Sequence, residues 1–166
     1  MITTISKHDL SESEGLLTAL VKLNNDHAVE LSWVDEDRLM TLIDRAFMAE
    51  RVGRADAMLI AFDQAADYDS PNFLWFRARY SRFIYVDRVV TSQAARGKGL
   101  AKALYRKLID RAQAVGHDRI VCEVNSDPPN PASDAFHQAL GFRPVGTASL
   151  GNGKVVTYLE LPLEHV

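Results

Sequence analysis

The spacing of hydrophobic residues divides the first half of the chain into short strands and amphipathic helices. Apolar residues that recur every three or four positions predict a helix, whereas a short apolar run bounded by polar residues predicts a strand. The pattern predicts a strand at 1–6, a helix after Ser11 with apolar residues at 16–23, a helix at 35–51, and strands at 55–62 and 72–76 joined by a polar hairpin loop.

The second half gives a sharper prediction, because glycine and proline mark the ends of its elements. The apolar segment 82–90 predicts a strand, the amphipathic run 100–114 a helix, and the β-branched segment 119–124 another strand. Such a strand–helix–strand unit makes its two strands parallel neighbours with a right-handed crossover. The remaining elements are a helix that starts at Asn130 and Pro131 and stops at Gly141, and a hairpin of strands at 144–150 and 155–161.

The composition fits one ordinary globular domain. The chain has 166 residues, of which 47% are hydrophobic and 25% charged. A net charge of −3 argues against a general nucleic-acid binder. No apolar run reaches the length of about 18 residues that crosses a membrane, and the N-terminus lacks a signal-peptide pattern. We therefore expect a single cytoplasmic domain over residues 1–166, with no nucleic-acid or membrane partner.

Cysteine and histidine usage predicts neither a disulfide nor a metal site. The single cysteine, Cys122, has no partner for an internal disulfide and fits a reducing compartment. His8, His117 and His165 do not stand at metal-ligand spacing from acidic residues or from Cys122. We expect no metal.

A glycine loop joins the strand at 82–90 to the helix at 100–114. Gly97 and Gly99 let backbone N–H groups approach a bulky anion, and the first N–H groups of the helix lack internal partners. The alternative is a plain turn that enters a solvated surface helix. Two common phosphate loops do not fit: the GxxxxGK[ST] spacing is absent, and GxGxxG would need a glycine where Lys102 stands.

The loop does match the pattern [QR]-x-x-G-x-[GA], as Arg96-x-x-Gly99-x-Ala101, and a second motif runs from Asn130 to Gly141-Phe142. In these two motifs the chain resembles the GNAT superfamily of acyl-CoA-dependent N-acyltransferases. The resemblance implies a mixed α/β fold: a central sheet of about seven strands flanked by four helices, with strands 4 and 5 parallel and splayed. It also implies an acceptor-side half at about 1–80 and a CoA-binding half at about 81–166.

The resemblance implies that the loop binds the pyrophosphate of acetyl-CoA, the co-substrate, and that backbone groups at the end of the strand at 82–90 bind its pantetheine arm. Val89 and Val90 are the candidates for the backbone amide that stabilises the oxyanion, although Thr91 stands where the family usually has an apolar residue. The implied coenzyme-binding residues are Val89, Val90, Thr91, Arg96, Gly97, Lys98, Gly99, Leu100, Ala101, Asn125, Asn130 and Phe136.

Three residues are candidates for proton transfer. At the position of His137, many family members have a tyrosine that is the proposed general acid. Three roles are open for His137: a general acid, a general base, or a side chain that only packs beside the coenzyme. Asp87 and Glu123 interrupt apolar strands and are candidates for the general base, because a charge there is costly unless it is paired or faces a cleft. A sheet ion pair between Asp87 and Arg88, and an outward-facing Glu123, are the structural alternatives.

Two functions of different class follow from the resemblance. The first is an N-acetyltransferase that moves an acetyl or short acyl group from acetyl-CoA to a primary amine, on a small molecule or a peptide, by direct attack in a ternary complex. The second is a non-catalytic CoA- or acyl-CoA-binding module or sensor. The sequence does not set the oligomeric state, and a homodimer is compatible with it.

Overall fold

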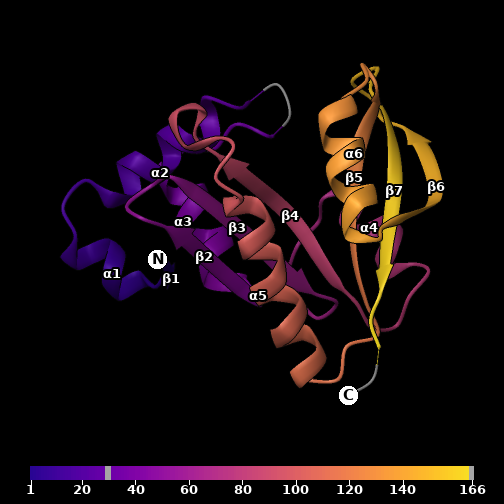
Figure 1. The fold of residues 1–166 in the computed structure, drawn as a ribbon, viewed down its shortest axis with the longest axis horizontal. Coiled ribbons are helices and arrows are strands. Elements are labelled where there is room, and N and C mark those ends of the chain that lie inside the picture. Colours follow the sequence, from indigo (N-terminus) through magenta and orange to yellow (C-terminus); the bar gives the residue numbers. More distant parts are fainter. Residues whose placement is uncertain (29–30, 165–166) are drawn as a thin grey trace.

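A seven-stranded sheet forms the centre of the computed structural model, which describes residues 1–28 and 31–164 (Figure 1). The strands stand in the order β1-β2-β3-β4-β5-β7-β6, and β4 and β5 are the parallel pair. Every other neighbouring pair is antiparallel. The strands are β1 (Ile2–Thr4), β2 (Met48–Val52), β3 (Ala57–Asp63), β4 (Ile84–Thr91), β5 (Arg119–Asp127), β6 (Arg143–Ser149) and β7 (Val155–Pro162).

Helices cover both faces of this sheet, so the protein has one hydrophobic core on each face. One core joins the apolar sides of α2, α3 and α4 to residues such as Tyr85 and Val121. The other joins α5 and α6 to residues such as Ile84 and Cys122. The helices are α1 (Lys7–Glu12), α2 (Leu16–Asn25), α3 (Glu36–Arg45), α4 (Pro71–Arg77), α5 (Leu100–Ala114) and α6 (Pro131–Leu140).

The expected helix at 35–51 is wrong in its second half. Helix α3 ends at Arg45, and Ala46 is extended, with φ −72° and ψ 142°. After Phe47, residues Met48–Val52 form β2, which pairs with β1 on one side and β3 on the other. Ladder hydrogen bonds on both edges outweigh the helical spacing of the apolar residues that runs on to Phe47.

The expected strand at 72–76 is also wrong, because these residues lie in helix α4. Proline occupies the first turn of this helix, and Phe73 and Phe76, three residues apart, point into the core. Pro71 at the start of a helical spacing was the signal for a helix. The expected helix after Ser11 begins later, as α2 at Leu16. Neither α1 nor α4 was predicted as a helix, so the described residues form six α-helices where the resemblance implied four.

The parallel strands β4 and β5 pair only at their first residues and then separate (Figure 1). Their register contains two pairs, Ile84 with Ile120 and Tyr85 with Val121. A bulge in β4 faces the step between Ile60 and Ala61 of β3, and no residue of β3 is paired with Asp87. Beyond Tyr85 the strands diverge, which leaves one backbone edge of each strand without a partner strand. No helix among residues 1–28 and 31–164 is long and apolar enough to cross a membrane.

Candidate active site

A cavity of about 720 Å³ occupies the space where β4 and β5 separate. It is lined by β4 from Tyr85 to Thr91 and by β5 from Cys122 to Asn125. Unpaired backbone N–H and C=O groups at a strand edge are a template for an added extended chain. The open edges of β4 and β5 therefore suit an elongated ligand that carries amide groups of its own.

The glycine loop lies at the end of β4, where a second hollow of about 220 Å³ adjoins the cavity. Gly97 and Gly99 have φ values of +80° and +72°, which glycine adopts without strain. A Cβ atom at either position would meet nothing within 4 Å, so the space beside both backbones is open. Helix α5 begins directly after Gly99 with free N–H groups, and this geometry suits a phosphate.

Most of the residues predicted for the site line the two hollows. Lys98 belongs to the same loop but lines neither hollow. Asn130 caps α6, its side-chain oxygen accepting from the Ser133 N–H at 3.3 Å, as the sequence predicted. The large cavity is lined by Asp87, Val89, Val90, Thr91, Arg96, Ala101, Glu123, Asn125, Asn130, Phe136 and His137, and the smaller hollow adds Gly97, Gly99 and Leu100.

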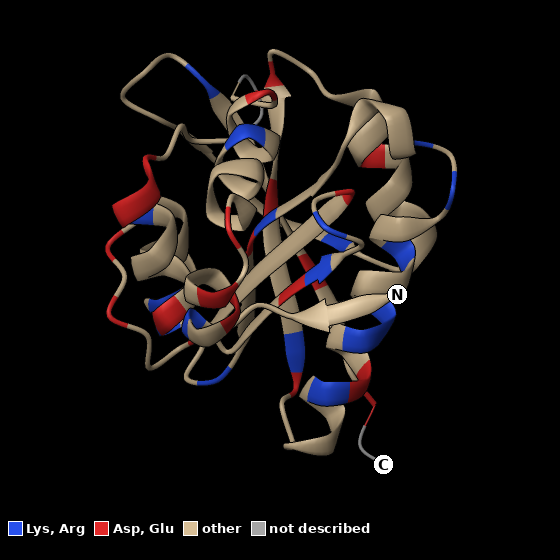
Figure 2. Cartoon of the chain, turned by 90° about the vertical axis from the view of Figure 1, so that its left-hand side faces the viewer, with Lys and Arg blue, Asp and Glu red and all other residues tan. Residues whose placement is uncertain are grey.

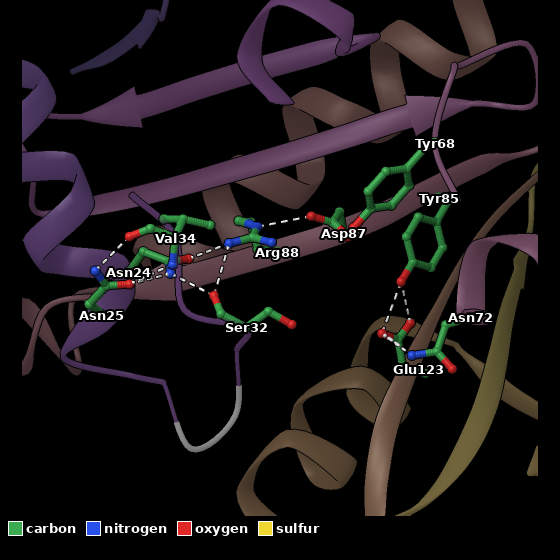
Figure 3. Close-up of polar contacts among 10 residues, drawn as sticks. All are labelled: Asn24, Asn25, Ser32, Val34, Tyr68, Asn72, Tyr85, Asp87, Arg88 and Glu123. Carbon is green, nitrogen blue, oxygen red and sulfur yellow. Dashed lines mark hydrogen bonds and ion pairs between the residues drawn. The ribbon is translucent and has the colours of Figure 1, made fainter. Parts of the chain in front are cut away.

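The carboxyl group of Glu123 sits on β5 at the point where the strands part. The Tyr85 hydroxyl lies 2.9 and 2.8 Å from its two oxygens, and Asn72 Nδ2 donates to Oε1 at 3.0 Å (Figure 3). Although Glu123 is partly accessible from the cleft, protein atoms crowd its carboxyl group. This desolvation raises its pKa to about 8; the charge of Asp87 adds to the rise, and the hydrogen bonds from Tyr85 and Asn72 oppose it.

The second carboxylate, Asp87, is committed to partners within the protein. Its Oδ2 lies 2.9 Å from Arg88 Nε, and its Oδ1 accepts from the Tyr68 hydroxyl at 2.5 Å. Both ion-pair side chains are 5% exposed. Arg88 also donates to Asn24 Oδ1 at 2.7 Å and to the Ser32 carbonyl at 3.3 Å, which ties β4 to the segment after α2 (Figure 3). Asp87 therefore forms the sheet ion pair that the sequence offered as an alternative.

His137 is 5% exposed on α6, and both of its ring nitrogens have partners. Nδ1 lies 2.8 Å from the Ser133 carbonyl, which only accepts, so Nδ1 carries the proton. Nε2 then accepts from the Tyr105 hydroxyl at 2.8 Å. Burial lowers the pKa of His137, so the ring is neutral at neutral pH.

Four polar residues of the cleft network were missed by sequence reasoning. Tyr68 hydrogen-bonds to Asp87, Asn72 to Glu123, and Tyr105 to His137. Tyr158 hydrogen-bonds to Asn72. Tyr68 and Asn72 belong to the β3–β4 connection, which was read as a loop and a strand. A correctly predicted helix at 71–77 would have placed Asn72 in the first turn. No local sequence pattern, however, indicates that Asn72 bonds to Glu123.

Among the residues that the structure describes, no group of three or more His, Cys, Asp or Glu side chains is placed to hold a metal ion. Cys122 is buried, and burial raises the pKa of its thiol well above the usual range. His165 lies outside the described residues.

Comparison with known proteins connects this cleft to acetyl transfer. Residues 72–142 match the family model described as acetyltransferase (GNAT) family. The matched stretch contains β4, the glycine loop, β5 and α6, which line much of the cleft. A search of curated proteins found no match.

Solved structures share the fold over nearly the whole chain. The ribosomal-protein-S18-alanine N-acetyltransferase from Escherichia coli is 17% identical, with a TM-score of 0.68 over 100% of this chain and 95% of that chain. The NatC complex bound to Gag peptide and CoA is 15% identical, with a TM-score of 0.72 over 99% and 98%. Ard1 from Thermoplasma volcanium is 11% identical, with a TM-score of 0.74 over 99% and 98%.

Proposed function

We propose that this chain transfers the acetyl group of acetyl-CoA directly to a primary amine in a ternary complex. The match to the acetyltransferase (GNAT) family and the fold shared with N-acetyltransferases support this proposal. The carbonyl carbon of the thioester gains a bond to the amine nitrogen and loses its bond to sulfur. The amine must give up a proton before or during the attack, and the departing thiolate takes one up. The protein has to hold both reactants, accept the first proton and stabilise the oxyanion.

Glu123 is the general base in this proposal, and its raised pKa is the observation that carries it. A base works best when its pKa lies near the working pH, since it is then both available and strong enough to take a proton. A pKa of about 8 meets this condition, whereas an ordinary glutamate near 4.5 would be a weak base. Asp87 fits the role less well, because Arg88 and Tyr68 occupy its two oxygens.

The coenzyme contacts in this proposal follow the open edges of the cleft. Backbone amides around Gly97 and Gly99 and the start of α5 would hold the pyrophosphate. The free edge of β4 would pair with the pantetheine amides, and the backbone N–H of Val89 or Val90 would face the oxyanion. We assign His137 a packing role beside the coenzyme, because neither ring nitrogen has a proton directed into the cleft.

The acceptor amine would enter through the part of the cavity that is lined by the β3–β4 connection and the segment after α2. Tyr68, Asn72 and Ser70 line one side of this part, and Ser32 and Trp33 line the other. The lining is polar and aromatic around one titratable carboxyl group. It suits an uncharged amine that Glu123 has deprotonated, on a small molecule or at the end of a peptide.

The test measures release of the CoA thiol from acetyl-CoA in the presence of mixed primary amines. Glu123→Gln should lower kcat/KM by about 10²-fold or more. Glu160→Gln is the matched control, since Glu160 on β7 accepts from the Tyr80 hydroxyl at 2.7 Å but does not line the cavity, and it should stay within about threefold of wild type. Equal activity of the two variants would refute the base, and no thiol release with any amine would favour the CoA-binding module.

A further inference from the structure

A chain of two consecutive hydrogen bonds leads to Glu123 from Tyr158 on β7, which lies outside residues 72–142. The Tyr158 hydroxyl on β7 donates to Asn72 Oδ1 at 2.8 Å. Asn72 Nδ2, at the start of α4, donates in turn to Glu123 Oε1 at 3.0 Å (Figure 3). The chain thus joins three elements, β7, α4 and β5, at one carboxyl oxygen.

The two hydrogen bonds together determine which end of the Asn72 amide faces the carboxylate. With the amide turned over, Oδ1 would face Glu123 Oε1, which places two acceptors in contact when Glu123 is ionised. The hydroxyl proton of Tyr158 would at the same time lose its acceptor. The arrangement with both bonds therefore favours an N–H that points at Glu123, and such a bond stabilises the ionised carboxylate.

Packing holds both donors in place. The ring of Tyr158 stacks on Trp75, with centroids 4.1 Å apart and an interplanar angle of 20°. Tyr158 also packs edge-on with Phe76, with ring centroids 5.1 Å apart, and Phe76 is fully buried. Tyr158 is itself 1% exposed. Because α4 supplies these packing partners as well as Asn72, the helix and β7 position the chain as one unit.

We propose that Asn72 and Tyr158 are positioning residues that orient the Glu123 carboxylate and favour its ionised form. Asn72 donates to Oε1 directly, and the hydrogen bond from Tyr158 orients Asn72. The catalytic meaning of this tuning rests on Glu123 being the general base, but the tuning itself does not. It gives the β3–β4 connection, which the sequence suggested was a loop and a strand, a direct part in the site.

Other groups around Glu123 set the background against which these two residues act. Tyr85 donates to the carboxylate from β4 and opposes the effect of burial, whereas the negative charge of Asp87 adds to it. Arg88 pairs with Asp87 and weakens that charge. The titratable groups coupled to Glu123 are Tyr85 and Asp87 of β4, Tyr68 of the β3–β4 connection, Tyr105 of α5, Cys122 of β5 and Tyr158 of β7.

The experiment follows the Glu123 carboxyl carbon by NMR during a pH titration of the carbon-13-labelled protein, without any acceptor. Glu123→Gln assigns the signal by its disappearance. Asn72→Ala should raise the Glu123 pKa by about one unit, because a hydrogen bond to a charged group is lost. Tyr158→Phe keeps the ring packing and should raise it by about half a unit. Tyr80→Phe, which removes a tyrosine-to-carboxylate bond of 2.7 Å on Glu160, should leave it unchanged.

The double variant tests whether Tyr158 acts through Asn72. The combined shift should equal that of Asn72→Ala alone, because the second bond has nothing left to orient. Additive shifts, or no shift in Asn72→Ala, would overturn the proposal. The result is separate from the proposed function: an active Glu123→Gln variant would remove the general base while the shifts of the tuning residues remained.

Discussion

The Tyr85 hydroxyl lies 2.9 and 2.8 Å from the two carboxylate oxygens of Glu123, across the last point at which β4 and β5 are paired. Tyr85 and Val121 form the second and final pair of that register, and Glu123 is the first β5 side chain on the same face beyond it. The strands therefore separate directly in front of a carboxyl group that a protonated phenol holds. The pKa of Tyr85 is raised well above the usual range, so the phenol keeps its proton.

This arrangement predicts the pH dependence of the reaction. Glu123 must be deprotonated to act as a base, so kcat/KM should rise with pH and level off above about 8. Two units below that value, the rate constant should be about 100-fold under its plateau, because only the ionised fraction is active. Tyr85→Phe should move the rise to higher pH, since the hydrogen bond that stabilises the ionised form is lost.

The pH profile of kcat/KM between pH 5.5 and 9.5 checks this prediction. The free amine has an ionisation of its own near pH 10, so an acceptor of lower pKa should leave the rise near 8 in place. A rise that persists near 8 in Glu123→Gln would show that another group titrates there.

The buried pair of Asp87 and Arg88 should be important for stability. Arg88→Met leaves an unpaired charge beneath the cleft and removes the bonds to Asn24 and Ser32. We expect a loss of about 3–5 kcal/mol in the free energy of unfolding, as when one partner of a buried ion pair is removed. Urea denaturation measures it.

Two comparisons separate charge from packing in that experiment. The exposed pair of Arg45 and Asp67 lies 3.5 Å apart with side chains 40% and 92% exposed, so Arg45→Met should cost less than about 1 kcal/mol. Asp87→Asn combined with Arg88→Met should recover most of the stability, because no buried charge is left. A loss in the double variant as large as in Arg88→Met would mean that the bonds to Asn24 and Ser32 dominate.

The glycine loop and the start of α6 were predictable because their signals are local. Gly97 and Gly99 mark a loop whose backbone takes positive φ, and Asn130 with Pro131 marks the start of a helix. Each of these sequence signals depends on residues only a few positions apart. The parallel pairing of β4 and β5 followed in the same way from one strand–helix–strand unit.

The polar contacts around Glu123 and Arg88 were harder to predict because their partners are distant along the chain. Asn72 reaches Glu123 across 51 positions, and Tyr158 reaches Asn72 across 86. Asn24 is fully buried, and Arg88 donates to it across 64 positions. Local helix and strand propensities do not encode contacts between residues distant in sequence. The expected helix over β2 was wrong for the same reason, because β2 is held by strands that are distant along the chain or follow it.

Charge is spread over several helices and loops, with acidic and basic residues on the same side of the molecule (Figure 2). The basic residues near the glycine loop include Arg96, Lys98 and Lys102, all exposed. Coenzyme binding should therefore weaken in high salt, because exposed charge pairs are screened. Calorimetry with CoA, and with pantetheine as the ligand that lacks the nucleotide, measures this; equal affinity for both would exclude a phosphate site in the loop.

Gly99→Val should raise the Kd for CoA at least about tenfold. The valine would place a branched side chain in the open space beside the backbone at a φ of +72°. Gly116→Val, at a φ of +81° after the other end of α5, is the matched control for backbone strain. Both should lose about 1–2 kcal/mol of stability, and only Gly99→Val should lose affinity. Equal affinities would place the pyrophosphate elsewhere.

The last prediction concerns His137, whose position in the family motif suggests a proton donor to the departing thiolate. The hydrogen bonds argue for the other alternative: Nδ1–H is bonded to the Ser133 carbonyl, and Nε2 accepts from Tyr105. The lowered pKa leaves no second proton on the ring at neutral pH. We therefore expect His137→Ala to raise the Kd for CoA, because the ring packs against Phe136 at 5.3 Å, and to leave kcat within about threefold.

The test compares kcat at saturating acetyl-CoA and acceptor from pH 6 to 9 in wild type, His137→Ala and His137→Tyr. A proton donor would instead show a loss of about 10²-fold in His137→Ala, with CoA affinity nearly unchanged. His137→Tyr would then recover much of the rate and carry the pH dependence upward, since a phenol keeps its proton to about pH 10. Tyr105→Phe removes the hydrogen bond to His137 Nε2 and tests the same question. If the His137 ring only packs, this variant should change CoA affinity and not kcat.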